Sequence, residues 1–229
     1  MWAVSATGVS YLQTSNDAVT QMGATLYFPG SNIIAQSLLT SVLTQPFTTV
    51  EQIRAALQFL GLTGGQAAGP AYSVVDNNNV LYSGAVGSVV AVGLISPALP
   101  ALGVQVLRSM PASAFVQSSE AIAGLSLTYD GKLAVLGTRS ISIIDRNFNT
   151  TPQTIRFGGD ETISNSLAID ENNGIYIVSD KKMHKVVWTG SVLSNQAADG
   201  AWESVYPTGD TFPTLFGSGS GSTPSRISR

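Results

Sequence analysis

The sequence predicts an all-β fold, a β-propeller of about four to six blades that can form a small or incomplete ring. Three observations predict it. Three segments repeat one strand–turn–strand pattern, and their strands are rich in β-branched and aromatic residues. The turns between the strands contain Asp, Asn and Gly, which favour tight hairpins because Asn and Gly adopt positive φ at little cost.

The repeat aligns on an aspartate that ends one apolar strand and opens a turn. The segments are AYSVVDNNNVLYSGAVGSVVAVGL, LSLTYDGKLAVLGTRSISIID and SLAIDENNGIYIVSDKKMHKVVW, with Asp76, Asp130 and Asp170 at the turns. Their separations of 54 and 40 residues bracket the period of roughly 40 to 50 residues of a four-stranded blade. We therefore predict three clear blades.

Weaker segments flank these blades. GVSYLQTSNDAVTQMGATLYFPG contains two strand-like runs upstream, and GAWESVYPTG is predicted to be the outermost strand of the third blade. DTFPTLFGSGSGSTPS could open one more blade. We treat the chain, 1–229, as a single propeller domain that ends in a flexible tail, 217–229, because Gly and Ser dominate that segment.

Residues 31–62 are predicted to form a helical hairpin inserted between blades. SNIIAQSLLTSVLT begins at a Ser/Asn cap, and TTVEQIRAALQFLG runs from a Thr cap to a Gly stop. Apolar residues of the second helix share one face at helical spacing: Ile53, Ala56, Leu57 and Leu60. The hairpin either packs on the rim of the propeller, or covers its mouth or contacts a partner.

The composition excludes several classes of protein. Hydrophobic residues make up 44% of the chain and charged residues only 11%, against a usual charged share of about 25%. The chain is therefore too apolar to be disordered, and no apolar run approaches the roughly 18 to 20 residues of a membrane span. The net charge of -3 and the scattered 11 Lys and Arg residues form no basic surface for nucleic acid.

The absence of cysteine excludes disulfides, thiolate chemistry and Cys-ligated zinc. A cysteine-free chain rich in Ser, Thr, Gly and Asn is compatible with export, so we expect a secreted or periplasmic protein, with a cytoplasmic protein as the alternative. The first residues, MWAVSATGVS, lack the basic region and the long apolar region of a signal peptide.

The third repeat resembles a known family. SNSLAIDENNGIYIVSD is similar to the SNGLAW-x-x-DG-x-x-x-Y-x-x-DS blade of the gluconolactonase/regucalcin group of calcium-dependent propeller lactonases, and more distantly to NHL and strictosidine-synthase-type propellers. The resemblance implies that Asn165 is a metal ligand at the mouth of the central channel. Ser166 stands where the family has glycine. The family's first-blade glutamate, in an EGP-x-W setting, and its PDG aspartate have no clear match.

Acidic residues add candidate ligands for a Ca²⁺ ion. Ten residues before the turn aspartates of the second and third repeats lie Glu120 and Asp160. Calcium takes roughly six to eight oxygen ligands, and Asn165 with Asp160, Glu161 and Glu120 would supply such a set without His or Cys. In the alternative interpretation these Asp and Asn residues are ordinary turn residues that bond their own backbone.

Two functions follow as hypotheses. The first is a calcium-dependent hydrolase that opens lactones, either sugar lactones or the acyl-homoserine lactones of bacterial quorum sensing. The metal would act as a Lewis acid on the carbonyl, and Glu161 or Asp160 would act as the general base. The alternative is a non-catalytic propeller that binds a protein partner or serves as a scaffold. A segment of a larger propeller is a third possibility.

The basic segment KKMHKVV is expected to carry no catalytic triad. His184 is the only histidine, and no GxSxG motif accompanies it, so we expect a surface or strand residue rather than a triad member. The alternative is a lone general base on a propeller face. Lys181, Lys182 and Lys185 are expected to form a solvated blade edge, which would discourage pairing with other sheets.

Overall fold

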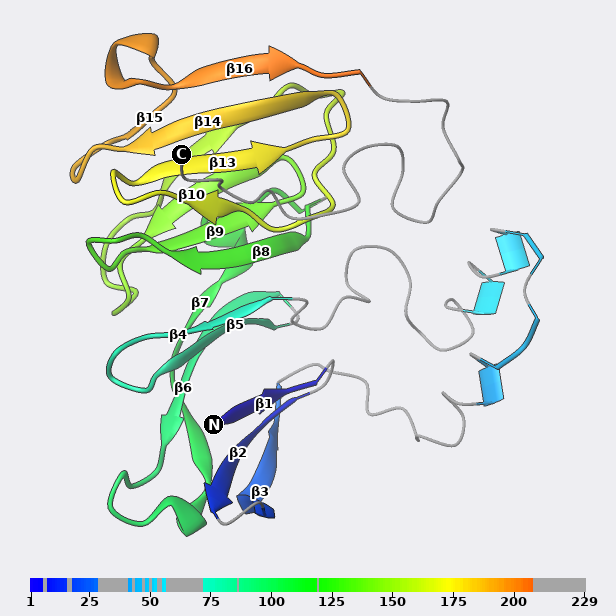
Figure 1. The fold of residues 1–229 in the computed structure, drawn as a ribbon, viewed down its shortest axis with the longest axis vertical. Helices are drawn as coiled ribbons and strands as arrows, with labels where there is room; N and C mark the ends of the chain where they lie inside the picture. Colours follow the sequence, from blue (N-terminus) through cyan, green and yellow to red (C-terminus); the bar gives the residue numbers. More distant parts are fainter. Residues whose placement is uncertain are drawn as a thin grey trace.

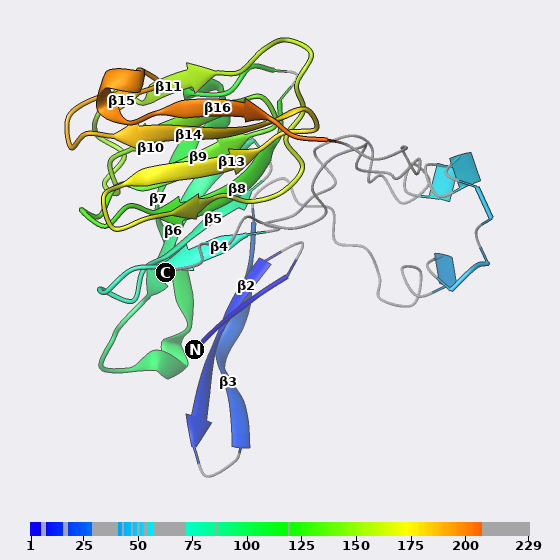
Figure 2. The ribbon, with the colours of Figure 1, turned by 45° about the horizontal axis from the view of Figure 1, so that its top comes forward.

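The computed structural model in Figure 1 describes most of the chain as a series of antiparallel sheets. The described residues are 1–5, 8–15, 18–28, 41–42, 44–46, 48–49, 51–52, 55–56, 72–85, 87–118 and 120–207. Within them, four sheets follow one another in chain order, and two views show them stacked face to face (Figures 1 and 2).

The N-terminal sheet has three strands in the order β1-β2-β3. Its strands are β1 (Trp2–Val4), β2 (Gly8–Ser15) and β3 (Ala18–Tyr27). β2 and β3 are the two strand-like runs predicted upstream of the repeats. They form a long hairpin that packs against the next sheet around Val9 and Phe28.

The three predicted blades are confirmed. Blade 1 contains β4 (Ser73–Val75), β5 (Leu81–Ala85), β6 (Ser88–Leu94) and β7 (Val104–Pro111). Blade 2 contains β8 (Ile122–Leu127), β9 (Leu133–Gly137), β10 (Ser140–Ile144) and β11 (Gln153–Arg156). Blade 3 contains β12 (Ala168–Ile169), β13 (Gly174–Val178), β14 (Lys182–Trp188), β15 (Leu193–Ser194) and β16 (Trp202–Val205).

The first strand of each blade lies innermost, because β8 contacts both β4 and β12. Each blade then runs outward as an antiparallel meander. This arrangement is that of consecutive propeller blades, and the all-β propeller prediction is confirmed. In blade 3, β15 and β16 pair with different parts of β14, so the predicted outermost strand around Trp202 is also confirmed.

The alternation of side chains along each strand fills the layers between sheets. In β9, Leu133 and Val135 face blade 1, whereas Ala134 and Leu136 face blade 3. Successive side chains of a strand point to opposite faces, so one fully buried strand contributes to two hydrophobic cores. A third core joins blade 1 to the N-terminal sheet.

The first turn of each blade has the same construction. In blades 1 and 3 an aspartate Oδ1 atom accepts N–H groups from the second and fourth following residues, at 2.9 Å around Asp76 and at 2.9 and 2.8 Å around Asp170. In blade 2 the hydroxyl of Thr128 takes this place and accepts the N–H of Lys132 at 2.8 Å. The alignment of Asp130 with the other two aspartates was therefore wrong by two residues.

Positive φ angles occur in these turns as predicted. Asn79 and Asn173 both have φ of 59°, and Gly131 has 84° at the equivalent position of blade 2. These are the residue types that adopt the left-handed region at least cost.

Most of the predicted helical hairpin, 31–62, lies outside the described residues. Residues 41–42, 51–52 and 55–56 have helical conformation, but these short stretches do not make up a hairpin within the described part of the chain. The tail, 217–229, also lies outside it.

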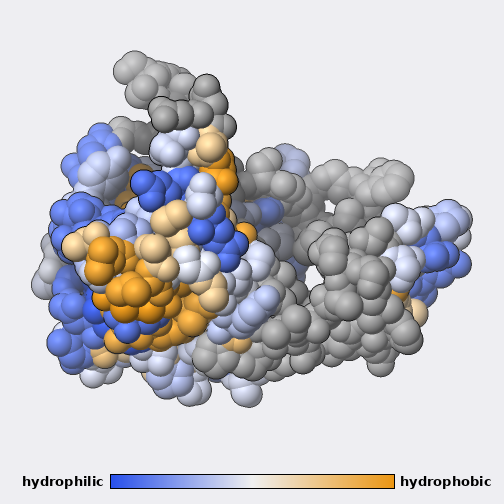
Figure 3. Space-filling view, turned by 90° about the horizontal axis from the view of Figure 1, so that it is seen from below, coloured by the Kyte–Doolittle hydropathy of each residue, from blue (hydrophilic) through white to orange (hydrophobic). Residues whose placement is uncertain are grey.

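The lower end of the stack in Figure 1 exposes apolar residues. Figure 3 views this end and shows an apolar patch, coloured orange. Large exposed apolar side chains lie on β3 and on the segment between β6 and β7: Val19, Tyr27, Ile95, Leu99 and Leu102.

Candidate functional site

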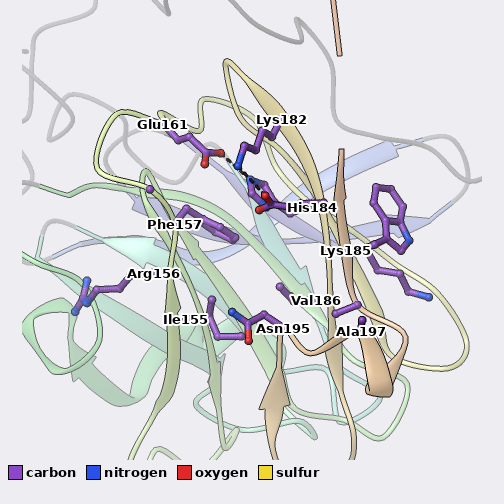
Figure 4. Close-up of a pocket in the computed structure, with 14 residues that line it drawn as sticks. Ile155, Arg156, Phe157, Glu161, Lys182, His184, Lys185, Val186, Asn195 and Ala197 are labelled. Atoms are coloured by element: carbon purple, nitrogen blue, oxygen red, sulfur yellow. Dashed lines mark hydrogen bonds and ion pairs between the residues drawn. The ribbon is translucent and has the colours of Figure 1, made fainter. Parts of the chain in front are cut away.

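A groove between blades 2 and 3 is the best candidate site among the described residues. Its volume is about 430 Å³, within the range of small-molecule pockets. One wall comes from β11 and its following turn, including Phe157, and the other from β14 and β16, including His184 and Glu203; Figure 4 shows Phe157 and His184 on the two walls. Glu161 reaches the same groove from the segment that leads into blade 3.

Glu161 forms the buried centre of this site. Its side chain is 5% exposed, and its Oε2 atom accepts the hydroxyl proton of Ser179 at 2.7 Å and lies 2.6 Å from His184 Nε2. Ser179 directly follows β13 and His184 lies in β14, so the carboxylate links the end of one strand of blade 3 to the next strand. The turn before it is closed by its own N–H, which donates to the Gly158 carbonyl.

Burial raises the pKa of Glu161, but the hydrogen bonds from His184 and Ser179 outweigh burial, so the pKa of this carboxyl lies below its ordinary value. The His184 ring packs on Phe157 with ring centroids 4.6 Å apart. On its other side, Nδ1 lies 3.7 Å from Glu203 Oε2. His184 is therefore buried between blades 2 and 3; of the two expected places, a strand or the surface, the structure shows the strand.

The order of these groups does not match that of a catalytic triad. In a triad the histidine lies between the nucleophile and the acid, so that it can take the proton of the hydroxyl. Here Glu161 lies between Ser179 and His184 and accepts from the hydroxyl itself. Ser179 is 1% exposed. The geometry fits a strand-to-strand contact better than an activated nucleophile.

Glu120 occupies the equivalent place in blade 2. The N–H of Glu120 donates to the carbonyl three residues before it, as that of Glu161 does, so the equivalent of Glu120 is Glu161 and not Asp160. The Glu120 side chain is 1% exposed. Its carboxylate accepts a hydrogen bond from the Ser140 hydroxyl at 2.5 Å and forms an ion pair with Arg156 at 2.8 Å. Both buried glutamates therefore bind groups of their own blade.

Asp160 and Asn165 lie in different environments. The Asp160 side chain is 75% exposed and pairs with Lys181, and the hydrogen bond from that ammonium group holds the pKa of Asp160 below its ordinary value. Asn165 is half-buried. Within the described ranges, no group of three or more His, Asp and Glu side chains could hold a metal ion. The structure thus brings Asp160 and Glu161 together only as chain neighbours.

Two further features escaped the sequence prediction. Lys182 and Lys185 lie in β14, an internal strand between β13 and the outer strands, so they do not form a blade edge. Lys182 pairs with Glu203 at 2.8 Å. The burial of His184 could have been recognised from alternation, because His184, Val186 and Trp188 occupy every second position and share the inward face.

The similarity of this chain to a curated protein covers part of its length. No family model matches it. It is 39% identical over 114 residues to an uncharacterized protein of Archaeoglobus fulgidus. The match covers 48% of this chain and 22% of the relative, so the chain spans about a fifth of the length of that relative.

Solved structures with some similarity include a β-propeller domain. The β-propeller domain of Cps50 (Swd1) from Myceliophteria thermophila is 13% identical, with a TM-score of 0.39, over 61% of this chain and 39% of that chain. The extracellular domain of a putative hybrid two-component system from B. thetaiotaomicron is 18% identical, with a TM-score of 0.38, over 75% and 16%. The Chaetomium thermophilum Nup170 N-terminal domain, solved with Nup53, is 16% identical, with a TM-score of 0.38, over 56% and 22%. Likeness at this level carries no functional argument, so the assignment of a propeller rests on the blades themselves.

In the part of the chain that the structure describes, we find no helix with the length and apolar character of a membrane-spanning segment.

Proposed function

We propose that the chain is a non-catalytic propeller module that serves as a scaffold for a protein partner. The observation that carries this proposal is the use of the two buried glutamates: Glu120 and Glu161 occupy equivalent places in successive blades, and each binds a serine and a basic or imidazole group of its own blade. Carboxylates whose oxygens are hydrogen-bonded in this way stabilise pairs of strands rather than bind a substrate. Exposed apolar patches such as that in Figure 3 often mark protein contacts.

The test compares stability with catalysis. We expect Glu161→Gln and Glu120→Gln to lower the melting temperature, and we expect no hydrolysis of gluconolactone or of short and long acyl-homoserine lactones above the buffer rate. Calcium and chelator should leave the melting temperature of the unmodified protein unchanged. Asp160→Asn, at an exposed position next to Glu161, is the matched control and should change neither quantity. Calcium-dependent lactone turnover that is lost in Glu161→Gln would overturn the scaffold proposal.

A second candidate is the calcium-dependent lactonase, and one observation favours it. Glu161 lies at the wall of a groove large enough for a small molecule. In this alternative Asn165 would bind Ca²⁺ with Asp160 and Glu120, Glu161 or Asp160 would act as the general base, and the protein would be secreted or periplasmic. If this candidate is correct, Asn165→Ala should abolish both calcium-dependent stabilisation and turnover, because it removes a ligand of the Ca²⁺ ion. Normal turnover in that variant would exclude Asn165 as a ligand.

A further inference from the structure

The contact between blades 1 and 2 shows how one blade covers the preceding one. On the face of blade 1 that meets blade 2, Tyr82 donates its hydroxyl proton to Asp76 Oδ2 at 3.2 Å. Arg146, in the turn after β10 of blade 2, forms an ion pair with the same oxygen at 2.9 Å. Phe148 of that turn packs edge-on against the Tyr82 ring, with centroids 6.3 Å apart, and Tyr82 is 0% exposed.

The contact between blades 2 and 3 uses the same position of the covering blade. Trp188, at the end of β14, donates its indole N–H to Asp130 Oδ2 in the first turn of blade 2 at 2.8 Å. Arg146 and Trp188 occupy equivalent positions in their blades. In blade 2, Ile144 of the third strand pairs with Leu133 of the second strand, and Arg146 lies two residues after Ile144. In blade 3, Val186 pairs with Ile175 in the same way, and Trp188 lies two residues after Val186. In both contacts, therefore, this position supplies a donor to an acid in the first turn of the preceding blade.

Blade 3 repeats the accepting half of the contact on its outward face. Tyr176 occupies the position of Tyr82 and donates to Asp170 Oδ2 at 2.8 Å. Lys185 Nζ lies 3.9 Å from Asp170 Oδ2 and 5.5 Å from the centre of the Tyr176 ring. Trp202, at the position of Arg108 in blade 1, lies 6.3 Å from Tyr176.

The exposure of this face differs from that of its counterpart in blade 1. Tyr176 is only partly buried and Trp202 is 43% exposed, whereas Tyr82 is 0% exposed. Both equivalent donors of the described blades are already in use, because Arg146 binds Asp76 and Trp188 binds Asp130. Within the described residues, Asp170 Oδ2 is paired only with groups of its own blade, Tyr176 and the more distant Lys185, and not with a donor of a covering blade.

We propose that the outward face of blade 3 is the docking surface for a further propeller blade. That blade places an arginine guanidinium or a tryptophan indole N–H at Asp170 Oδ2 and packs apolar side chains on Tyr176 and Trp202. Tryptophan and tyrosine beside a buried charge form the kind of surface that dominates binding energy at interfaces. The inference rests on the proposed scaffold role and names the partner of one of its faces.

The experiment supplies such a blade to the full chain. A second copy of residues 112–156, which contains the Arg146 donor, is fused after the last residue, and hydroxyl-radical footprinting measures the oxidation of Tyr176 and Trp202. We expect the oxidation of Trp202 to fall from the level of a side chain 43% exposed towards that of a covered residue such as Tyr82. Tyr129, which is 68% exposed in blade 2, is the internal reference and should not change.

The matched control fusion carries Arg146→Ala and Phe148→Ala in the second copy alone, and there Trp202 should remain as reactive as in the original chain. A second fusion with a copy of residues 157–207 supplies the Trp188 donor, so that failure of one graft to fold does not decide the question.

Equal oxidation of Trp202 in the original chain and in both fusions would overturn the proposal. Protection of Trp202 in the original chain as its concentration rises would also overturn it, because a second copy would then be the occupant. Lactone turnover would instead contradict the scaffold role and leave the footprinting result standing, so the two failures are distinguishable.

Discussion

The buried contact of Glu161 leads to a quantitative prediction for Glu161→Gln. The substitution keeps the size of the side chain but removes the charge that accepts Ser179 at 2.7 Å and lies 2.6 Å from His184. Hydrogen bonds to charged groups contribute about 1.5–3 kcal/mol each, and a glutamine carbonyl can keep one acceptor in weaker form, so we expect a loss of about 3 kcal/mol in the free energy of unfolding. For a chain of this length that corresponds to a fall of roughly 6–12 °C in melting temperature.

The pH dependence of this difference follows from the lowered pKa of Glu161. A carboxyl whose pKa is lower in the folded state contributes stability above its unfolded pKa, and this contribution is lost as the pH falls through the folded value. The ordinary value is 4.5. The difference between the original protein and Glu161→Gln should therefore be complete at pH 7 and should shrink below pH 4.5.

Urea unfolding followed by circular dichroism at several pH values measures both effects. Asp160→Asn is the control, because that carboxylate is largely exposed and pairs only with Lys181 at the surface, where ion pairs contribute little. The reasoning would be refuted if Glu161→Gln were as harmless as Asp160→Asn at pH 7, or if its effect did not decrease in acid.

Two other substitutions test the packing between blades. Trp188→Phe removes the indole donor to Asp130 and should cost about 2 kcal/mol in urea unfolding; an unchanged midpoint would mean that this bond does not join blades 2 and 3. Gly124→Ala places a Cβ atom 2.6 Å from Ser166 Oγ and 2.9 Å from Ser166 Cα. Overpacking of this kind should cost about 1–3 kcal/mol in the free energy of unfolding. A melting temperature equal to that of the original protein would show that the inner strands move apart freely.

The sequence predicted the blades because their signals are local. Alternating apolar residues and the turns at Asp76 and Asp170 depend on residues only a few positions apart, and the structure reproduces them. The turn of blade 2 was misaligned because Thr128 can accept the same backbone N–H as an aspartate. A hydroxyl oxygen and a carboxylate oxygen can both accept this N–H group, so Asp130, two residues later, was aligned with the aspartates of the other two repeats.

The candidate site was predicted less well, because its contacts join distant residues. The sequence aligned Glu120 with Asp160, one residue from its structural equivalent Glu161, and it could not show that Ser140 and Ser179 bind the two glutamates. Those contacts join residues about 20 positions apart and depend on how strands pair. Similarly, nothing local distinguishes Lys182 on an edge strand from Lys182 on an internal strand.

The double-sided burial of blade 2 has a consequence for folding. Because β9 and β10 are buried along their whole length and contribute to the cores on both sides, blade 2 cannot open without exposing the apolar faces of both neighbours. In such a linear array, stability spreads from unit to unit through the interfaces, and the units at the ends open first. Amide protons of the central blade should therefore exchange with solvent only through the largest cooperative opening of the array, and those of β16 and β3 through smaller openings that leave the centre intact.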